Sequence, residues 1–353
     1  MIFKNLFGKR QQGKKERPLF QAVYRENYKH LPQRYLSKDI LLGTAVGDAL
    51  GFPVQFFPRE KVRQDPVIGM GKCRTFESPS GIWSDDTSLS LCLADSLCSG
   101  YNLQDVANKF IQWLFEGLWT PNNRAFDIGR TTMQAISNLR NGVEPEFAGL
   151  DRDRDNGNGS LMRISPLVPY IYGLIEEQQI QIISEVSSLT HRHPRSILAC
   201  IFLCKFEMAY MDCQNLRTAF VNTQKGIKEL LKQDEFRNEI GHFNRLVNYT
   251  YEQFRDIPEP DIKSTGYVID TLEASLWSIF KHDNFKDSVL CAVNLGNDAD
   301  TVGAVTGATA GIVYGHASIP KEWLEILARK NDIVQLAKKL DASIFLPPKY
   351  SVV

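Results

Sequence analysis

The sequence contains no apolar segment of the length needed to cross a lipid bilayer. Its most apolar stretch, residues 302–315, is shorter than the roughly 20 residues of a spanning helix and contains no long aliphatic block. The first ten residues turn polar too soon to form the core of a signal peptide. Net charge is also missing, because 41 basic residues balance 41 acidic ones. We therefore expect no membrane insertion and no binding of nucleic acid through overall charge.

Paired cysteines are missing as well. The chain has seven cysteines, an odd number with no paired spacing: Cys73, Cys92, Cys98, Cys200, Cys204, Cys213 and Cys291. Several of them, such as Cys200 and Cys204, lie within apolar helical runs. We interpret them as reduced core residues and expect a cytoplasmic protein.

Strand patterns are scarce. Alternation of apolar and polar residues is rarely sustained, the turn signals of hairpins are absent, and no repeat of fixed period is evident. The composition, with 43% hydrophobic and 23% charged residues, is that of an ordinary globular protein. We predict a compact all-α fold of many helices.

What the chain does have is a series of glycines spaced four residues apart. Gly303, Gly307, Gly311 and Gly315 fall on one face of a predicted helix. Each interior glycine destabilises a helix by about 0.5–1 kcal/mol relative to alanine, so another element should approach this backbone closely. We predict a buried central helix. Small residues recur at the same spacing in residues 40–51 and predict a second tightly packed helix.

Carboxylates and hydroxyls gather at the start of two predicted buried helices. The first cluster comprises Ser84, Asp85, Asp86 and Thr87, and the second comprises Asp298, Asp300 and Thr301. Helix capping alone could explain either cluster, but a cap needs one such residue and each cluster has two acids. Oxygen ligands suit magnesium or manganese rather than zinc. If the clusters converge, they could hold two such ions and activate a water molecule.

Two further motifs lie between these clusters. The turn Gly157-Asn158-Gly159-Ser160 offers backbone N–H groups to an anion such as a diphosphate. His191 and His193 precede a helical run from Pro194, which suits a first helical position. Without a cysteine or acidic partner nearby, we interpret the histidines as helix-terminus or substrate-contact residues.

The first 38 residues differ from the rest of the chain. Ten basic residues stand against only Glu16 and Glu26, with aromatic and apolar side chains among them. A solvated tail needs no such aromatics, so docking on a partner is a second interpretation beside disorder. We predict an N-terminal extension over residues 1–38, a catalytic body over 39–345 and a C-terminal tail over 346–353.

Taken in order, six segments resemble the ADP-ribosylglycohydrolase family, typified by the dinitrogenase-reductase-activating glycohydrolase. They are Gly47 to Gly51, Ser84 to Thr87, Asn158 to Arg163, Thr190-His191, Gly266 to Leu272 and Gly296 to Thr301. The resemblance covers about residues 40–345. It implies a two-magnesium (or manganese) centre and hydrolysis of the bond that joins ADP-ribose to a modified protein side chain, commonly arginine.

The resemblance also implies the site residues. Positions that match metal ligands are Ser84, Asp85, Asp86, Asp298, Asp300 and Thr301, and of these Asp85, Asp298 and Asp300 are the expected catalytic residues. Substrate-binding positions are Gln55, Asn158, Gly159, Ser160, His191 and Tyr267, of which Asn158, Gly159, Ser160 and His191 would hold the diphosphate and ribose.

Two departures from the family pattern matter. Many relatives carry a glutamate seven residues after the aspartate of the Gly-Asp motif, whereas this chain has Gln55, which cannot accept a proton. The N-terminal extension is the second departure. It resembles immunity-type members in which an extension plugs the active site of an ADP-ribosyltransferase toxin, and Arg17 or Arg25 could mimic the arginine that the toxin modifies.

Several functions therefore remain open. The leading hypothesis is a hydrolase that removes ADP-ribose from proteins. The alternatives are a binding or immunity protein with weak or no hydrolase activity, a relative that has lost catalysis, and another magnesium-dependent hydrolase of ADP-ribose-like nucleotides.

Overall fold

The computed structural model describes residues 36–71 and 78–345, and within these ranges every regular element is a helix. The longer elements are α1 (Leu36–Gly51), α2 (Arg59–Gln64), α3 (Asp85–Leu97), α4 (Leu103–Glu116), α5 (Arg130–Arg140), α6 (Val168–Ile171), α7 (Glu176–Ser188), α8 (Pro194–Cys213), α9 (Leu216–Leu230), α10 (Asn244–Asn248), α11 (Tyr251–Arg255), α12 (Val268–Lys281), α13 (Phe285–Val293), α14 (Ala299–Tyr314), α15 (Lys321–Ile326) and α16 (Lys330–Phe345). The predicted all-α class is confirmed.

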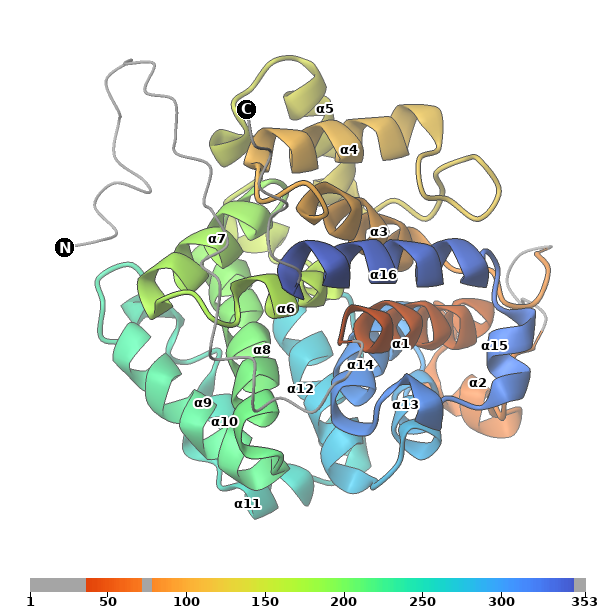
Figure 1. Ribbon diagram of the computed structural model, residues 1–353. Coiled ribbons are helices and arrows are strands. Elements are labelled where there is room, and N and C mark those ends of the chain that lie inside the picture. Colours follow the sequence, from red (N-terminus) through yellow and green to blue (C-terminus); the bar gives the residue numbers. More distant parts are fainter. Residues whose placement is uncertain (1–35, 72–77, 346–353) are drawn as a thin grey trace.

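Helices α1 and α14 lie side by side at the centre of the molecule (Figure 1). Their glycines face one another: a Cβ atom added to Gly307 would lie 2.1 Å from the carbonyl oxygen of Gly43. A Cβ at Gly47 would lie 1.9 Å from the carbonyl oxygen of Gly303. No side chain fits at those distances, so glycine on both helices permits backbone-to-backbone contact. The two glycine series seen in the sequence are the two halves of one interface.

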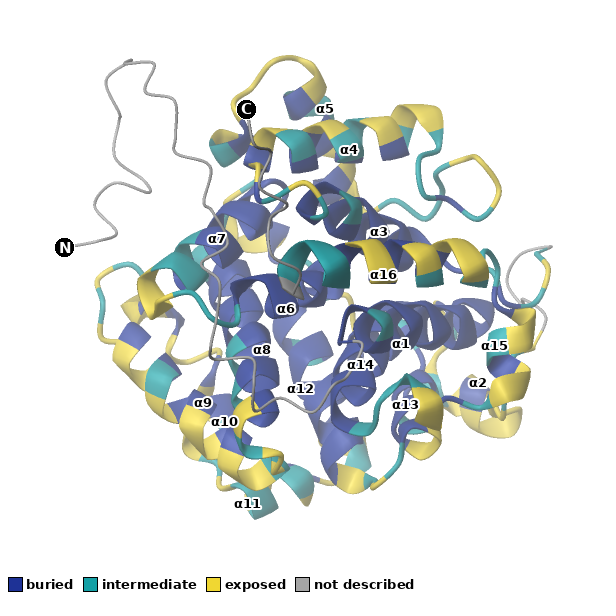
Figure 2. Cartoon of the chain, in the orientation of Figure 1, coloured by how far each residue is buried: buried dark blue, intermediate teal, exposed yellow. Residues whose placement is uncertain are grey.

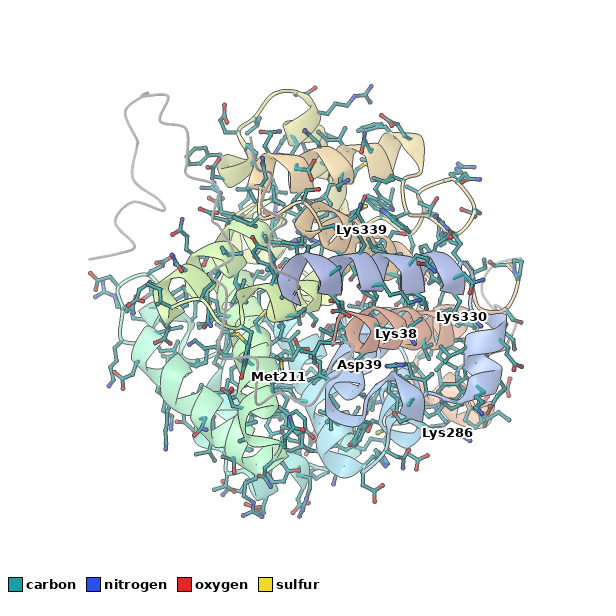
Figure 3. All side chains as sticks on the ribbon, viewed as in Figure 1. Lys38, Asp39, Met211, Lys286, Lys330 and Lys339 are labelled. Atoms are coloured by element: carbon teal, nitrogen blue, oxygen red, sulfur yellow. The ribbon has the colours of Figure 1, made fainter. Side chains whose placement is uncertain are left out.

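The fourth glycine of the series has a different function. Gly315 has φ +76° and ends α14, so it is a C-terminal residue of the helix rather than part of the contact face. At this end Asp39, in the first turn of α1 (Figure 3), accepts a hydrogen bond of 2.7 Å from the backbone N–H of His316. A polar contact therefore joins α1 to the end of α14, in addition to the contacts between the glycines.

The remaining helices surround this pair. Figure 2 shows α1, α12 and α14 buried along most of their length, whereas α4, α9 and α16 expose their outer faces. Helices α3 and α16 pack on α1, and α12 and α13 pack on α14. Within the described ranges no helix is both long and apolar enough to span a membrane, and all six described cysteines are free thiols.

One helix was not predicted, and one boundary differs from the sequence prediction. The helix that was not predicted is α2, which follows α1 and the 3-10 turn Phe52–Val54. Helix α1 begins at Leu36, so the last three residues assigned to the extension belong to it. The rest of the predicted extension and the predicted tail, residues 346–353, lie outside the described residues.

Candidate active site

The N-termini of α3 and α14 meet beside α1, and the two acidic clusters of the sequence meet there with them. Across 215 sequence positions, the Thr301 hydroxyl lies 3.5 Å from Asp86 Oδ2. Asp48 of α1 fixes the start of α3, because its carboxylate accepts the N–H of Ser84 at 2.9 Å and the N–H and hydroxyl of Thr87 at 3.0 and 2.6 Å. Asp48 of the Gly-Asp motif thus holds the first cluster in place at the side of α1.

Capping accounts for only part of these clusters. The Ser84 side chain caps α3 by accepting the N–H of Asp86 at 3.3 Å, whereas the Asp298 side chain makes no capping hydrogen bond to α14. Asp86 Oδ1 and Asp300 Oδ2 are buried and have no hydrogen-bond partner among the described residues. Burying a carboxylate oxygen without a hydrogen-bond partner costs free energy, so these acids have a function other than capping the starts of helices.

The electrostatics of the cluster are unfavourable without a cation. Burial first, and then repulsion from neighbouring carboxylates, raises the pKa of Asp85 and of Asp300 well above the usual value. Burial likewise raises the pKa of Asp86, with Asp48 the strongest of its charged neighbours. Like charges gathered in a low-dielectric pocket disfavour one another's ionisation, and a bound cation would reverse that effect.

Gln55 lies at the same pocket and contacts an acid that sequence reasoning missed. Its Nε2 donates to Asp127 Oδ2 at 2.6 Å, while its own Oε1 is buried without a partner. Asp127 has a left-handed backbone (φ 57°) in the loop before α5, a conformation uncommon for a residue other than glycine. Burial raises its pKa. An isolated acid in a polar loop has no distinctive sequence pattern, so only the fold identifies it.

The predicted diphosphate-binding turn forms the opposite wall. The Asn158 side chain donates to Asp298 Oδ2 at 2.6 Å and to the Thr271 hydroxyl at 2.9 Å, which joins the turn to the acidic cluster. The His191 ring packs on the turn so closely that a Cβ at Gly159 would lie 2.8 Å from its Cε1 atom. Glycine is therefore required there for the ring to approach.

His191 is neutral in this setting. Burial, together with the charge of Arg163, lowers the pKa of its imidazole to about 3. Its Nδ1 lies 2.8 Å from the Thr190 hydroxyl, and its Nε2 lies near Gly157, where an added Cβ would be 3.4 Å away. A neutral imidazole can donate or accept a hydrogen bond toward a substrate oxygen, but it does not supply a positive charge.

A fully buried arginine supports this wall from behind. Arg163 donates to the Gly159 carbonyl oxygen and, at 2.9 Å, to the Thr190 hydroxyl, and its guanidinium lies 4.8 Å from the ring centroid of Phe110. It therefore fixes both the glycine turn and the residue that precedes His191. Ser160 also lies behind the wall, where its hydroxyl accepts a hydrogen bond from Ser187 at 3.0 Å.

Tyr267 is not part of the pocket lining. Its hydroxyl lies 3.0 Å from His242 Nδ1, and the Arg195 guanidinium lies 5.8 Å from the centroid of its ring. The preceding residue, Gly266, does line the pocket, and its carbonyl oxygen accepts the N–H of Asn158 at 3.0 Å. The segment predicted from the sequence reaches the site through its backbone rather than through the tyrosine ring.

Together these walls enclose a pocket of about 300 Å³. Eight of the predicted site residues line it: Gln55, Asp85, Asn158, Gly159, His191, Asp298, Asp300 and Thr301. Ser84, Asp86, Ser160 and Tyr267 do not. A larger groove of about 390 Å³ lies among α7, α8 and α9, but it contains none of the predicted site residues.

The pocket has the donor chemistry of a hard-cation site, namely buried oxygen ligands that repel one another and have unpartnered lone pairs. Within residues 36–71 and 78–345, however, no three acidic, histidine or cysteine side chains already surround one point as metal ligands. The assignment of individual ligands therefore stays a prediction.

Comparison with known proteins gives a consistent result. Residues 33–348 match the family model described as ADP-ribosylglycohydrolase. The chain is 33% identical over 308 residues to the ADP-ribosylarginine hydrolase Tri1 of Serratia proteamaculans, covering 86% of this chain and 78% of that protein. It is 29% identical to the ADP-ribosyl-[dinitrogen reductase] glycohydrolase of Rhodospirillum rubrum, covering 86% and 94%. A solved ADP-ribosylglycohydrolase-related protein complex superposes with a TM-score of 0.71 at 27% identity, covering 89% of this chain and all of that one.

Proposed function

The chain belongs to the ADP-ribosylglycohydrolase family, and from this premise we propose that it hydrolyses the glycosidic bond between ADP-ribose and a modified arginine of a protein. The observation that carries the proposal is the meeting of two acidic clusters, 215 positions apart in the chain, beside a glycine turn that can bind a diphosphate. The relatives named as hydrolases of ADP-ribosylarginine and of ADP-ribosyl-dinitrogen reductase support this choice of bond.

Two magnesium or manganese ions fit the acidic end of the pocket. The side chains that would hold them all offer oxygen atoms, and two of the carboxylates have unpartnered oxygens: Ser84, Asp85, Asp86, Asp298, Asp300 and Thr301. Ser84 and Asp86 lie outside the pocket lining, so they would contact the ions from the start of α3, next to Asp85. When bound, such ions would neutralise the carboxylates and lower the pKa of a coordinated water. Two features support this assignment: the oxygen atoms of these side chains and the repulsion between their carboxylates.

The residues of the other walls would position the substrate. The turn from Gly157 to Gly159 lines the pocket, where its backbone would lie against a diphosphate. Neutral His191 would contact a phosphate or ribose oxygen. Asp127 is the group able to accept a proton near Gln55, because the amide of Gln55 cannot do so and instead donates to Asp127 Oδ2.

The proposal is tested by ADP-ribose release from an ADP-ribosylated arginine protein, with and without magnesium. We expect wild-type protein to release ADP-ribose only with the divalent metal, and Asp300→Asn to lose at least about a hundredfold in rate while remaining folded. Asp283→Asn, at an exposed position outside the pocket, is the matched control and should keep wild-type activity. Full activity of folded Asp300→Asn would refute the assignment.

Residues 1–38 carry a second proposal, that the extension binds an ADP-ribosyltransferase toxin. Its support is compositional: interfaces draw on aromatic residues and arginine, which are mixed in this segment. Because α1 begins at Leu36, deleting residues 1–35 leaves the helices of the body complete. We expect the truncated protein to keep ADP-ribose release and to lose toxin binding. Retained binding, or loss of the fold, would contradict this proposal.

A further inference from the structure

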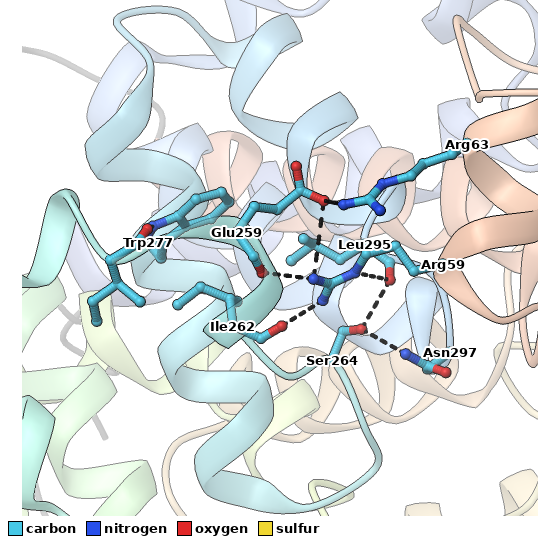
Figure 4. Close-up of polar contacts among 9 residues, drawn as sticks. Arg59, Arg63, Glu259, Ile262, Ser264, Trp277, Leu295 and Asn297 are labelled. Carbon is cyan, nitrogen blue, oxygen red and sulfur yellow. Dashed lines mark hydrogen bonds and ion pairs between the residues drawn. The ribbon is translucent and has the colours of Figure 1, made fainter.

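Arg59, the first residue of α2, places its guanidinium between loops that come from distant parts of the chain (Figure 4). Its side chain is 10% exposed. The Nε atom donates to the carbonyl oxygen of Leu295 at 3.0 Å, and Nη1 donates to that of Glu259 at 2.6 Å. Nη2 donates to the carbonyl oxygen of Ile262. One side chain therefore joins α2, the segment 259–267 and the loop 294–298.

These loops carry residues of the candidate active site. The Ser264 hydroxyl donates to the Leu295 carbonyl oxygen at 3.1 Å, and the Ser264 carbonyl oxygen accepts the N–H of Asp298 at 2.9 Å. Two residues further on, Gly266 O accepts the N–H of Asn158. Of the residues that Arg59 contacts, Leu295 is thus three positions from Asp298, and Ile262 is four positions from Gly266, the partner of the diphosphate-binding turn.

The backbone around Arg59 is packed just as tightly. Gly296 has φ +70°, and a Cβ there would lie 3.0 Å from the backbone N of Arg59. Phe56 N–H donates to the Asn297 carbonyl oxygen at 2.6 Å, and Asn297 N–H donates to the Phe57 carbonyl oxygen at 2.7 Å. Phe56 and Asn297 both have positive φ. Such strained backbone persists only where surrounding contacts hold it.

We propose that Arg59 is a positioning residue of the active site, which holds the loop of Asp298 and the segment of Gly266 in register with Gln55. This inference rests on the proposed function. The guanidinium contacts neither the pocket nor a carboxylate at hydrogen-bond distance, since its nearest acidic atom, Glu259 Oε1, lies 3.9 Å away and is bound by Arg63 at 2.7 Å. Among the described residues, its hydrogen bonds all go to backbone carbonyl groups, and the Glu259 carboxylate adds only a longer ion pair.

The geometry requires arginine. A planar guanidinium carries five N–H donors in a fixed fork and can reach three carbonyl oxygens in different directions at once. The ammonium of lysine is a single point of charge and would satisfy only part of the set. Arg59→Lys therefore keeps the charge but loosens the loops, which separates positioning from electrostatics.

The test compares Arg59→Lys and Arg59→Ala with Arg63→Ala; among the described residues the half-exposed Arg63 guanidinium binds the Glu259 side chain. Three quantities are measured on the full-length protein: ADP-ribose affinity by calorimetry, kcat and KM for ADP-ribosylated arginine, and hydrogen exchange at the amides of Asn297 and Asp298. A misplacement of about 1 Å can reduce rates by up to a hundredfold. We expect Arg59→Lys to lose ten- to a hundredfold in kcat/KM, to bind ADP-ribose at least about tenfold more weakly and to exchange faster at these two amides. Arg63→Ala should stay within about twofold of wild type throughout.

Two outcomes would overturn the inference. In one, folded Arg59→Lys keeps wild-type affinity and exchange. In the other, Arg59→Lys loses thermal stability but its folded fraction binds ADP-ribose normally. That outcome is expected if Arg59 only stabilises the fold. If Arg59→Ala does not fold, Arg59→Lys still decides the question. If the wild-type protein neither binds nor releases ADP-ribose, the proposed function fails, but the exchange measurement still tests whether Arg59 holds the loops.

Discussion

Substituting Gly307 by alanine tests the central helix pair directly. The added Cβ would lie 2.1 Å from the carbonyl oxygen of Gly43, whereas ordinary contacts begin at 3.4 Å, so α1 and α14 would have to separate by about 1 Å. Because both helices are buried along their length, the separation loosens the contacts of the whole interface. Overpacking of this kind costs about 1–3 kcal/mol and sometimes more. The better helix propensity of alanine offsets only about 0.5–1 kcal/mol.

The matched control is Gly226→Ala in α9. There the nearest atoms to an added Cβ belong to the flexible Lys205 side chain, at 3.8 Å. This variant gains helix propensity without a clash, and its free energy of unfolding should rise by about 0.5–1 kcal/mol. Denaturant unfolding of both variants provides the assay. We expect Gly307→Ala to lose about 2 kcal/mol or more. If it is as stable as Gly226→Ala, the close backbone contact between α1 and α14 is wrong.

Two further predictions concern single carboxylates. Gln55→Glu places a second acid 2.6 Å from Asp127 Oδ2. We expect the two acids to share a proton and the rate of ADP-ribose release to change only modestly. A rate increase that approaches the roughly 10²–10⁴-fold of general-base catalysis would contradict this. Buried Glu207 accepts hydrogen bonds from Ser165 and Thr309, and burial raises its pKa to about 7. A raised folded-state pKa of an acid stabilises the fold at low pH, and that stability is lost as the pH rises from about 4.5 to 7. Glutamine does not titrate, so Glu207→Gln does not lose this stability. Its free energy of unfolding minus that of wild type should increase by up to about 3 kcal/mol from pH 5 to pH 8. A difference that does not change across this range would refute the reasoning.

Much of the fold could be predicted because its signals are local. Glycine spacing marked α14, small residues marked α1, and Pro194 marked the start of α8 at the position that the structure shows. That the two glycine series face each other could not be predicted, because helical spacing identifies a contact face but not its partner. The function of Gly315 was missed for a related reason: it continues the spacing, yet it has positive φ and ends the helix.

The site divides in the same way. Acids at helix starts were visible in the sequence, and the fold brings both clusters to one pocket. Asp127 and the supporting contacts of Arg163 and Arg59 depend on tertiary contacts between distant loops, and no local pattern marks them. Tyr267 was named because of its neighbours in the sequence, but its ring turns toward His242 while the backbone of the preceding glycine lines the pocket.

We propose that the two acidic clusters and the turn at Asn158 form one metal-dependent site for ADP-ribose. A crystal structure of the full-length protein with magnesium and ADP-ribose tests it most directly. We predict two cations between Asp85, Asp86, Asp298 and Asp300, with the diphosphate on the turn of Asn158 to Ser160. Cations bound elsewhere, or ADP-ribose bound outside this pocket, would contradict the account.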